Sequence, residues 1–334
     1  MAVDRFPLRE NSGPWEAHKV PILLLGLGES LPPVDRSTFP SLVRRSPQNM
    51  LNRVVCTVLA LASWAVASPL LDARQAGISD SVYDDLVRYT QYSSAAYQLL
   101  CLRPLGNTLV DQFSTLGTEG FIARDDDREE IVVSFRGSLS PVDALTDIQI
   151  IRTTLNTPGV ANVGDASVHI GFLNAYNLVA RDVLAVVQNQ TARHPKYKLV
   201  VTGHSLGGAL AAIGAISLQA AHPTVPIKLY TFGQPRTGNA AFAALVEQRI
   251  GVNNIFRAVH TFDGVPTILF QALGYKHFGT EYWNFQEPAC ADNTKKCSGP
   301  EDPKCSDSIP STGINLAHLS YFGQLMALNP LLCV

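Results

Sequence analysis

The sequence predicts an α/β fold in which a mixed, mostly parallel central sheet carries helices on both faces. Two observations lead to this prediction. Short β-branched segments alternate with amphipathic segments through the second half of the 334-residue chain, which is typical of parallel strands joined by helices. The stretch LVVTGHSLGGALAA, residues 199–212, also reads as a strand, a sharp glycine-rich turn and a helix. We therefore expect one catalytic domain over about residues 75–334, without an internal repeat or linker.

The expected elements follow from hydrophobic periodicity and from residues that begin or end helices. Apolar residues at helical spacing predict a first helix over 79–100, with Ser79 or Asp80 as its cap. Residues 118–138 read as two strands joined by a charged turn. A long amphipathic helix over 171–195 ends at a proline. Strands and helices then alternate, with strands expected over 197–203, 226–235 and 253–263, and helices over 205–222 and 238–251.

Composition and charge exclude several classes of protein. Apolar residues make up 46% of the chain and charged residues 16%, which is a globular composition. The 26 basic and 28 acidic residues give a formal net charge of −2. Such a balance provides no general attraction to nucleic acid or to an anionic membrane. We expect neither as a partner.

The N-terminal region differs from the rest of the chain. Residues 1–49 contain seven prolines and no amphipathic period. Arg53 then precedes an apolar run over 54–67 that ends in Ala-Val-Ala. A basic residue, a short apolar run and a small-residue site are the three parts of a secretory signal peptide. The run is too short to span a bilayer comfortably.

These features predict secretion to the extracellular space without a stable membrane anchor. We expect residues 50–67 to be the signal peptide and residues 68–74 a short pro-segment. Met50 is then the expected true start, and residues 1–49 are an upstream extension that is non-native or disordered. The alternative is a genuine disordered leader followed by a buried helix.

The cysteines are interpreted according to this expected compartment. Cys56 would leave with the signal peptide, and five would remain, namely Cys101, Cys290, Cys297, Cys305 and Cys333. Most should pair after secretion, and the odd count leaves one over. A bridge between Cys101 and Cys333 would stabilise the fold by about 4–5 kcal/mol, because it closes a very long loop. No cysteine or histidine group has zinc spacing, so we expect no metal. Asn189 begins a glycosylation sequon, which fits secretion.

Ser205 is the candidate nucleophile. It lies in Gly-His-Ser-Leu-Gly between an expected strand and an expected helix, which is the context of a nucleophile elbow in an α/β-hydrolase fold. Gly203 and Gly207 leave room where the strained turn brings the strand and the helix together. The N-terminus of the helix also favours a developing negative charge. The alternative is an ordinary turn in which the serine only caps the helix.

A serine nucleophile needs a base, and the base needs a carboxylate that orients it. In this fold class the chain order is serine, acid, histidine. Asp263 lies at the carboxyl end of the expected strand over 253–263, just after NIFRAVHTF, where such sheets place active groups. Four histidines follow Ser205, namely His222, His260, His277 and His318. We interpret His260 as a strand residue and His222 as a surface or capping residue, and the role of His277 stays open. His318 is the expected base.

An ordered set of motifs then resembles a known family. FRGS, GFLNAY, VTGHSLGGA, GQPRTGN, VHTFDGVPTI, EYW and AHLSYFG occur in this order between Ser79 and Val334. Together they resemble the fungal class 3 lipases, which include triacylglycerol lipases of filamentous fungi and related feruloyl esterases. The resemblance implies an α/β-hydrolase fold with a short lid helix. It places the catalytic triad on Ser205, Asp263 and His318, the same three residues. It also implies an oxyanion hole made by Ser138 and Leu206.

The resemblance places the lid in SLSPVDALTDIQI, residues 138–150. Val142, Leu145 and Ile148 are the expected lid or substrate-binding residues. Lipases of the family often have a tryptophan where this chain has Ala144, and feruloyl esterases of the family have more polar lids. The composition of this segment is intermediate between the two groups, which argues against strong activation by a lipid interface.

The resemblance also implies disulfide pairs. Cys101–Cys333 resembles the terminal bridge of the family, and Cys305 resembles one half of a small-loop bridge. Cys297 is the preferred partner of Cys305, which leaves Cys290 as the odd thiol. A Cys290–Cys305 pair is the alternative.

The sequence therefore predicts a secreted serine carboxylester hydrolase, and most specifically a lipase that cleaves acylglycerol esters through an acyl-enzyme. We expect it to act as a monomer on an ester substrate at a lipid–water interface, without a cofactor. A feruloyl esterase of the same family is the alternative enzyme. A non-catalytic lipid-binding protein with the same fold is a more remote alternative, because it would not need an intact set of catalytic residues.

Overall fold

The computed structural model describes residues 77–139, 150–310 and 313–334. The expected upstream extension, signal peptide and pro-segment lie outside these residues. The expected lid residues Val142, Leu145 and Ile148 also lie outside them, so those expectations stay predictions.

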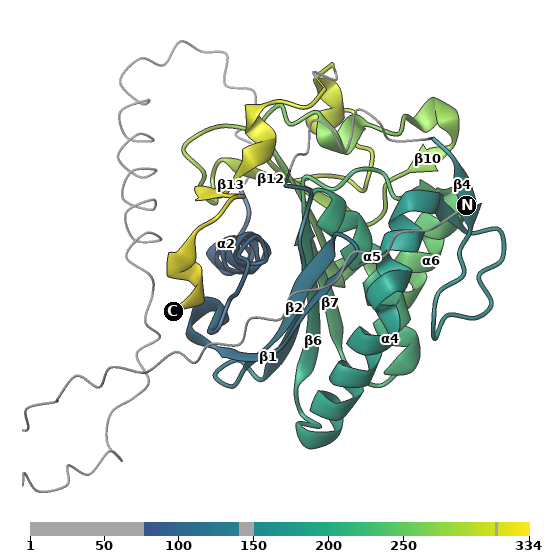
Figure 1. The fold of residues 1–334 in the computed structure, drawn as a ribbon. Coiled ribbons are helices and arrows are strands. Elements are labelled where there is room, and N and C mark those ends of the chain that lie inside the picture. The colour runs from purple at the N-terminus through teal and green to yellow at the C-terminus, as the bar shows by residue number, and fades with distance from the viewer. Residues whose placement is uncertain (1–76, 140–149, 311–312) are drawn as a thin grey trace, which may run out of the picture. The chain divides into compact units, whose positions relative to one another are not determined.

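Among the described residues, eight strands form the central sheet in the order β1-β2-β3-β6-β7-β9-β11-β12 (Figure 1). Strands β3, β6, β7, β9 and β11 run parallel to one another. Strands β1 and β2 at one edge, and β12 at the other, pair antiparallel with their neighbours. This confirms the predicted mixed, mostly parallel sheet. The bounds are β1 Thr108–Thr115, β2 Thr118–Asp125, β3 Glu130–Phe135, β6 Lys198–His204, β7 Ile227–Phe232, β9 Ile255–His260, β11 Thr280–Asn284 and β12 Thr294–Lys296.

Helices cover both faces of this sheet, as the sequence predicted. One face carries α2, and the other carries α4, α5 and α6 (Figure 1). Ala and Gly residues let α5 pack closely on the sheet, and twelve of its residues are buried. The helices are α2 Asp80–Ala95, α4 Ile170–Arg193, α5 Leu206–Ala221 and α6 Ala240–Ile250.

The first helix is shorter than predicted. Ser79 caps it, and its hydroxyl accepts a hydrogen bond from the N–H of Val82 at 3.4 Å. The helix ends at Ala95, five residues before the expected end, because Leu99 and Leu100 are exposed and the chain turns toward the Cys101 disulfide.

Helix α4 is long and apolar enough to cross a membrane by length and composition alone. One of its faces is buried in the larger core cluster, through residues such as Phe172, Tyr176 and Val183. It therefore serves here as a core helix. Asn189 is exposed near its C-terminal end, so its side chain is accessible to the predicted glycosylation.

The short elements of the described residues were not predicted. Their strands are two or three residues long, and such lengths carry no readable periodicity. They are β4 Arg152–Thr154, β5 Ser167–His169, β8 Gly238–Asn239, β10 Tyr275–Lys276, β13 Ser320–Tyr321 and β14 Gln324–Leu325. The 3₁₀ helices are Pro104–Gly106, Val252–Asn254, Val265–Thr267, Gln271–Leu273, Ser306–Ser308, Leu316–Leu319 and Pro330–Cys333.

Two disulfides connect described residues. Cys101–Cys333 joins the segment after α2 to the C-terminal segment, and Cys297–Cys305 closes a small loop after β12. Cys290 is also disulfide-bonded. The expectation that Cys290 is an odd thiol, and the alternative pair Cys290–Cys305, are therefore wrong.

Candidate active site

Ser205 lies at the turn between strand β6 and helix α5, as the motif predicted. Its backbone has φ 58° and ψ −129°, a conformation that costs a non-glycine residue about 1–3 kcal/mol. The fold holds it there, because the Ser205 N–H donates to the carbonyl of Phe232 at 2.9 Å. A Cβ on Gly203 would lie 2.2 Å from the carbonyl oxygen of Gly207, so the turn requires glycine at this position.

Asp263 and His318 form a buried hydrogen-bonded pair. His318 Nδ1 lies 2.8 Å from Asp263 Oδ2, and both side chains are fully buried. Asp263 follows β9, and His318 lies in the 3₁₀ helix Leu316–Leu319. The contact with a carboxylate places the proton of the imidazole on Nδ1, which leaves Nε2 available as an acceptor.

Two buried polar atoms have no hydrogen-bond partner among the described residues at this place. They are the hydroxyl oxygen of Ser205 and Nε2 of His318. The ring of His204, the residue before Ser205, lies against the ring of His318, with 4.4 Å between the two ring centroids. Buried polar groups normally pair, so each exception needs an explanation. A nucleophile and a base that pair only during reaction would explain both.

The two candidate oxyanion donors flank Ser205 from different segments. Leu206 is the first residue of α5, so its N–H has no acceptor within the helix. Ser138 follows β3 and is half-buried. Next to it, Gly137 lies so close to the elbow that an added Cβ would be 3.1 Å from Cβ of Ser205. The segment that carries Ser138 therefore packs directly against the nucleophile turn.

The comparisons with known proteins agree with this geometry. Residues 132–273 match the family model described as lipase (class 3). A secreted mono- and diacylglycerol lipase 1 of Fusarium solani is 31% identical over 83% of this chain and 90% of its own. The chain belongs to the class 3 lipase family.

Solved structures lead to the same family. A triacylglycerol lipase of Penicillium expansum is 29% identical with a TM-score of 0.70, over 75% of this chain and 97% of its own. A second structure is described as a triacylglycerol lipase whose catalytic centre is a serine protease triad. It is 31% identical with a TM-score of 0.66, over 77% of this chain and 99% of its own. The protein is thus a carboxylic ester hydrolase with the α/β-hydrolase fold, as predicted.

Two residues that the sequence analysis did not single out complete the surroundings of the pair in this lipase. The hydroxyl of Tyr321 donates to Asp263 Oδ2 at 2.5 Å. Burial, and then the charge of Asp263, raises the pKa of Tyr321 well above its ordinary value, so it keeps its proton. Asn315 donates to the carbonyl of Phe262 at 2.8 Å and so joins the loop of the base to the loop of the acid. Both lie close to His318 in sequence, and that proximity was the available signal.

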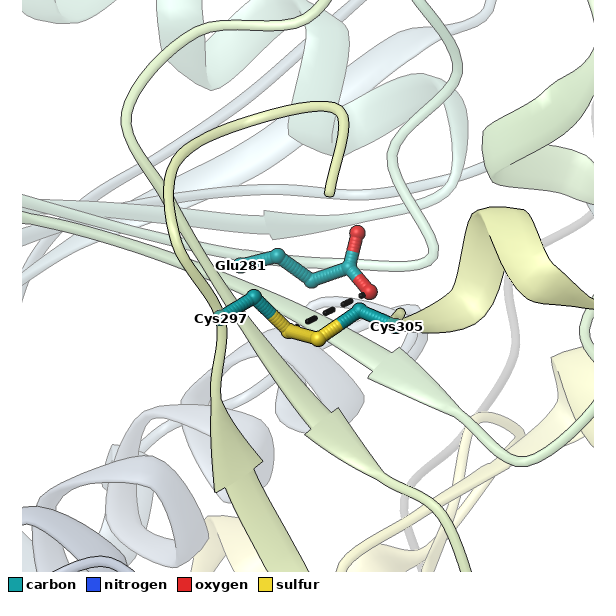
Figure 2. Close-up of side chains that lie close together, drawn as sticks. All are labelled: Glu281, Cys297 and Cys305. Atoms are coloured by element: carbon teal, nitrogen blue, oxygen red, sulfur yellow. Dashed lines mark hydrogen bonds between the residues drawn. A yellow bond between two sulfur atoms is a disulfide. The ribbon is translucent and has the colours of Figure 1, made fainter. Parts of the chain in front are cut away.

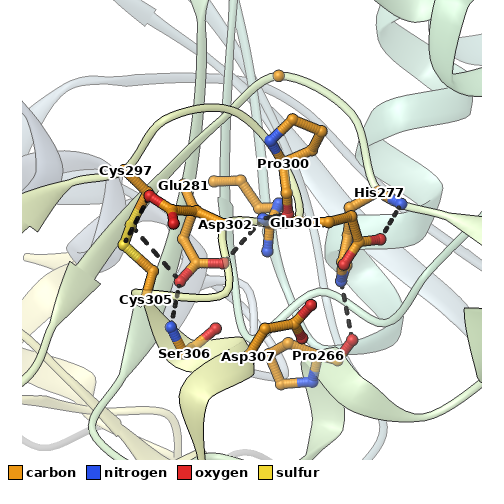
Figure 3. A network of polar contacts seen from close by, with 12 residues as sticks. Pro266, His277, Glu281, Cys297, Pro300, Glu301, Asp302, Cys305, Ser306 and Asp307 are labelled. Atoms are coloured by element: carbon orange, nitrogen blue, oxygen red, sulfur yellow. Dashed lines mark hydrogen bonds and ion pairs between the residues drawn. A yellow bond between two sulfur atoms is a disulfide. The ribbon is translucent and has the colours of Figure 1, made fainter.

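A buried ionic network holds the loop after Asp263 (Figure 3). Arg236 donates to the carbonyl of Thr267 at 3.0 Å and binds both carboxylate oxygens of Glu301 at 3.0 and 2.9 Å. Neutral His277 donates through Nε2 to the carbonyl of Pro266 at 2.8 Å. Burial, and then the charge of Arg257, lowers the pKa of His277 well below its ordinary value. These contacts fix the 3₁₀ helix Val265–Thr267, which begins two residues after Asp263 in the lipase.

A second buried ion pair attaches the loop that supplies Glu301. Arg257 on β9 binds Glu281 on β11 at 2.9 Å and also donates to the carbonyl of Pro300 at 2.6 Å. Glu281 accepts from the N–H of Ser306 at 3.0 Å. The disulfide Cys297–Cys305 closes the same loop (Figure 3). The acid loop of the lipase therefore rests on a cross-linked loop about forty residues further along the chain.

Among the described residues, one group brings together atoms that could hold a metal ion, namely Glu281, Cys297 and Cys305. Figure 2 shows that the two sulfur atoms are bonded to each other as a disulfide. A disulfide offers no thiolate, which is the form of cysteine that binds metals. The group is therefore a cross-link beside a carboxylate, and we propose no metal there.

The three other candidate histidines have structural contacts. His222 is the C-cap of α5, which agrees with its expected position. His277 belongs to the network below the acid loop. His260 ends β9 and hydrogen-bonds on both ring nitrogens. Among the four histidines that follow Ser205, the structure pairs His318 with Asp263.

Proposed function

We propose that the protein is a secreted lipase that hydrolyses acylglycerol esters with Ser205, His318 and Asp263 as its catalytic triad. The observation that carries this proposal is the buried, unpaired Ser205 hydroxyl in an elbow beside a His318 whose other nitrogen is fixed by Asp263. The triad described for a similar solved lipase supports the assignment. All three residues come from one chain, which is compatible with action as a monomer.

The proposed mechanism begins with attack of Ser205 on the ester carbonyl. His318 Nε2 takes the hydroxyl proton, and Asp263 stabilises the resulting imidazolium through Nδ1. The N–H groups of Leu206 and Ser138, with the Ser138 hydroxyl, hold the oxyanion of the tetrahedral intermediate. Each such donor contributes about 3–4 kcal/mol to lowering the barrier.

The intermediate then collapses and the C–O bond to glycerol breaks. His318 gives its proton to the leaving alkoxide, which departs as an alcohol and leaves an acyl ester on Ser205. Water enters, His318 removes one of its protons, and the hydroxide attacks the acyl carbonyl. The second intermediate releases the fatty acid, and the proton on His318 returns to Ser205.

Exposed apolar side chains near the candidate residues support a lipid-like substrate. Each of the three segments at the site carries an exposed apolar side chain next to its candidate residue. These are Leu139 beside Ser138, Phe262 beside Asp263, and Leu316 two residues before His318, with exposed fractions of 63%, 51% and 81%. Exposed apolar surface around a reactive centre fits an acyl chain or a lipid surface better than a polar ester. The Fusarium relative is named for mono- and diacylglycerols, and we propose partial acylglycerols as the preferred substrates.

A labelling experiment tests the nucleophile. A fluorophosphonate probe should label the purified wild-type protein and should not label the Ser205→Ala variant. Absence of wild-type labelling would contradict the serine mechanism. Labelling that persists in the variant would place the nucleophile elsewhere.

A substrate panel tests the acyl specificity. We expect hydrolysis of emulsified mono- and diacylglycerols to exceed hydrolysis of triacylglycerol and methyl ferulate. A clear preference for methyl ferulate over tributyrin would instead identify a feruloyl esterase. Recovery of the protein from culture medium, with its N-terminus read by mass spectrometry, tests secretion and the signal-peptide assignment.

A further inference from the structure

Two histidines outside the proposed triad hold the loop that carries His318. His204 Nε2 lies 2.8 Å from the carbonyl oxygen of His318. His260 Nδ1 lies 2.9 Å from the carbonyl oxygen of Ala317. A carbonyl only accepts, so each imidazole must donate an N–H in its contact. Two consecutive carbonyls of this loop therefore depend on two different histidines.

The two histidines differ at their second ring nitrogen. His204 Nδ1 lies 2.7 Å from the hydroxyl of Tyr97, which can donate, so a neutral ring satisfies both contacts. His260 Nε2 lies 2.6 Å from Glu287 Oε1, which accepts when ionised. His260 thus faces two acceptors, and only an imidazolium has two N–H groups to give them.

The surroundings of the two rings agree with this difference. Burial, and then the charge of His318, lowers the pKa of His204 well below its ordinary value. Burial also lowers the pKa of His260, but the hydrogen bond to Glu287, the bond to the Ala317 carbonyl and the charges of Glu287 and Asp263 outweigh it. The pKa of His260 is therefore raised overall.

The titratable groups that face His260 come from three elements. Glu287 comes from the loop after β11, and Asp263 from the loop after β9. Tyr321 comes from β13 and packs edge-on against the ring at 5.7 Å between centroids. Tyr321 stays neutral, so the two carboxylates are the charges that act on His260.

We propose that His260 is a positioning residue, a charged tether between Glu287 and the loop of His318. The proposal rests on the proposed role of His318 as the base. When the His260 imidazolium loses a proton, the neutral ring keeps one N–H and can satisfy only one of its two acceptors. Either the Ala317 carbonyl or Glu287 then loses its donor, and the loop of His318 loosens. This ionisation of His260 limits the chemical step on the alkaline side.

The variant Glu287→Gln tests the tether without touching the triad. The Glu287 side chain is 55% exposed, so the substitution removes a charge at the surface and leaves the core intact. NMR titration of the full chain, with the His260 ring signal assigned by its loss in His260→Gln, measures the ionisation directly. We expect a wild-type midpoint above the ordinary 6.5, and a midpoint lower by about one pH unit in Glu287→Gln. Asp126→Asn, at an exposed pair with Arg124 on the turn after β2, is the matched control and should leave the midpoint unchanged.

The pH dependence of catalysis tests the consequence. With a soluble short-chain p-nitrophenyl ester, the alkaline midpoint of kcat should fall by the same one unit in Glu287→Gln, with KM unchanged. Identical alkaline midpoints in the wild type and the variant would overturn the tether, as would a His260 midpoint at or below 6.5. Lack of esterase activity in the wild type would contradict the proposed function instead. The NMR titration needs no turnover and still tests His260 in that case.

Discussion

The nucleophile turn and the two loops that supply Asp263 and His318 are positioned in different ways. The turn at Ser205 is shaped mainly by residues within a few positions of it, through the close contact of Gly203 with Gly207. One hydrogen bond, from the Ser205 N–H to the carbonyl of Phe232, also ties it to the next strand. The other two loops contain only short 3₁₀ helices. They are held by side chains from distant parts of the chain, such as Arg236 and Glu301. A local motif can therefore specify the nucleophile, whereas the acid and base depend on the whole domain.

The largest expected effect is a loss of kcat when Asp263 in the acid loop is replaced. Asp263→Asn keeps the shape of the side chain but lets the amide donate, so it favours the wrong tautomer of His318. We expect kcat to fall about 10⁴-fold with the folded state retained. Steady-state kinetics on a soluble ester, beside circular dichroism of the same sample, measures this. A loss below tenfold would remove Asp263 from the triad.

The next largest expected effect is a loss of folding stability when the buried Arg236–Glu301 ion pair below that loop is broken. Glu301→Gln leaves buried Arg236 without its bidentate carboxylate, and breaking a buried pair costs about 3–5 kcal/mol. We expect the free energy of unfolding to fall by about 3 kcal/mol in urea titrations at pH 7. A change below 1 kcal/mol would show that the network does not hold the loop.

The same variant should change the acid dependence of stability. Although burial opposes it, Arg236 holds the pKa of Glu301 well below its ordinary 4.5. The stabilisation from Glu301 is therefore complete above pH 4.5 and is lost as pH falls through the lowered folded pKa. Burial and the charge of Glu301 raise the pKa of Asp307, which opposes part of this. The wild type should lose stability toward low pH more steeply than Glu301→Gln. Parallel curves would contradict the assignment.

A smaller loss of folding stability is expected at the nucleophile elbow, where close steric contacts, and not charges, fix the backbone. A Cβ on Gly207 would lie 2.3 Å from the carbonyl oxygen of Phe135, so Gly207→Ala must displace backbone. We expect a loss of about 2–3 kcal/mol in the free energy of unfolding. Gly214→Ala in the same helix is the matched control, since its Cβ would meet the Tyr176 ring at 3.1 Å. Equal losses in the two variants would mean that the elbow is not the constraint.

The smallest effect concerns the second donor to Asp263. Tyr321→Phe removes one hydrogen bond to a buried carboxylate and leaves His318 as its side-chain donor. We expect kcat to fall about tenfold, which corresponds to about 1.4 kcal/mol, with KM unchanged. A rise in KM at constant kcat would indicate a role in substrate binding.

The sequence was sufficient for the features that local chemistry determines. Hydrophobic patterns predicted the covering helices and five strands of the central sheet, whereas β1, β11 and β12 were not predicted. The glycine spacing around Ser205 predicted the elbow. Asp263 was found because the carboxyl end of a strand is a recognisable place. His318 followed from chain order, and the structure pairs it with Asp263.

Contacts between distant segments were not predictable in the same way. Tyr321 and Arg236 lie in the quoted motifs AHLSYFG and GQPRTGN, yet no spacing rule connects them to Asp263. The role of Glu301 needs the fold of a loop closed by Cys297–Cys305. The bonded state of Cys290 also could not be read from its spacing. Each of these is a three-dimensional property of the domain.

The bridge between Cys101 and Cys333, which are separated by 232 positions in sequence, turns the intervening chain into a covalent ring. A single proteolytic cut in any loop of that ring opens it without releasing a fragment. The nicked molecule would run as one band on a non-reducing gel and as two bands after reduction. A protease would then have to cut this lipase twice within the ring before a piece of the ring could separate from the rest.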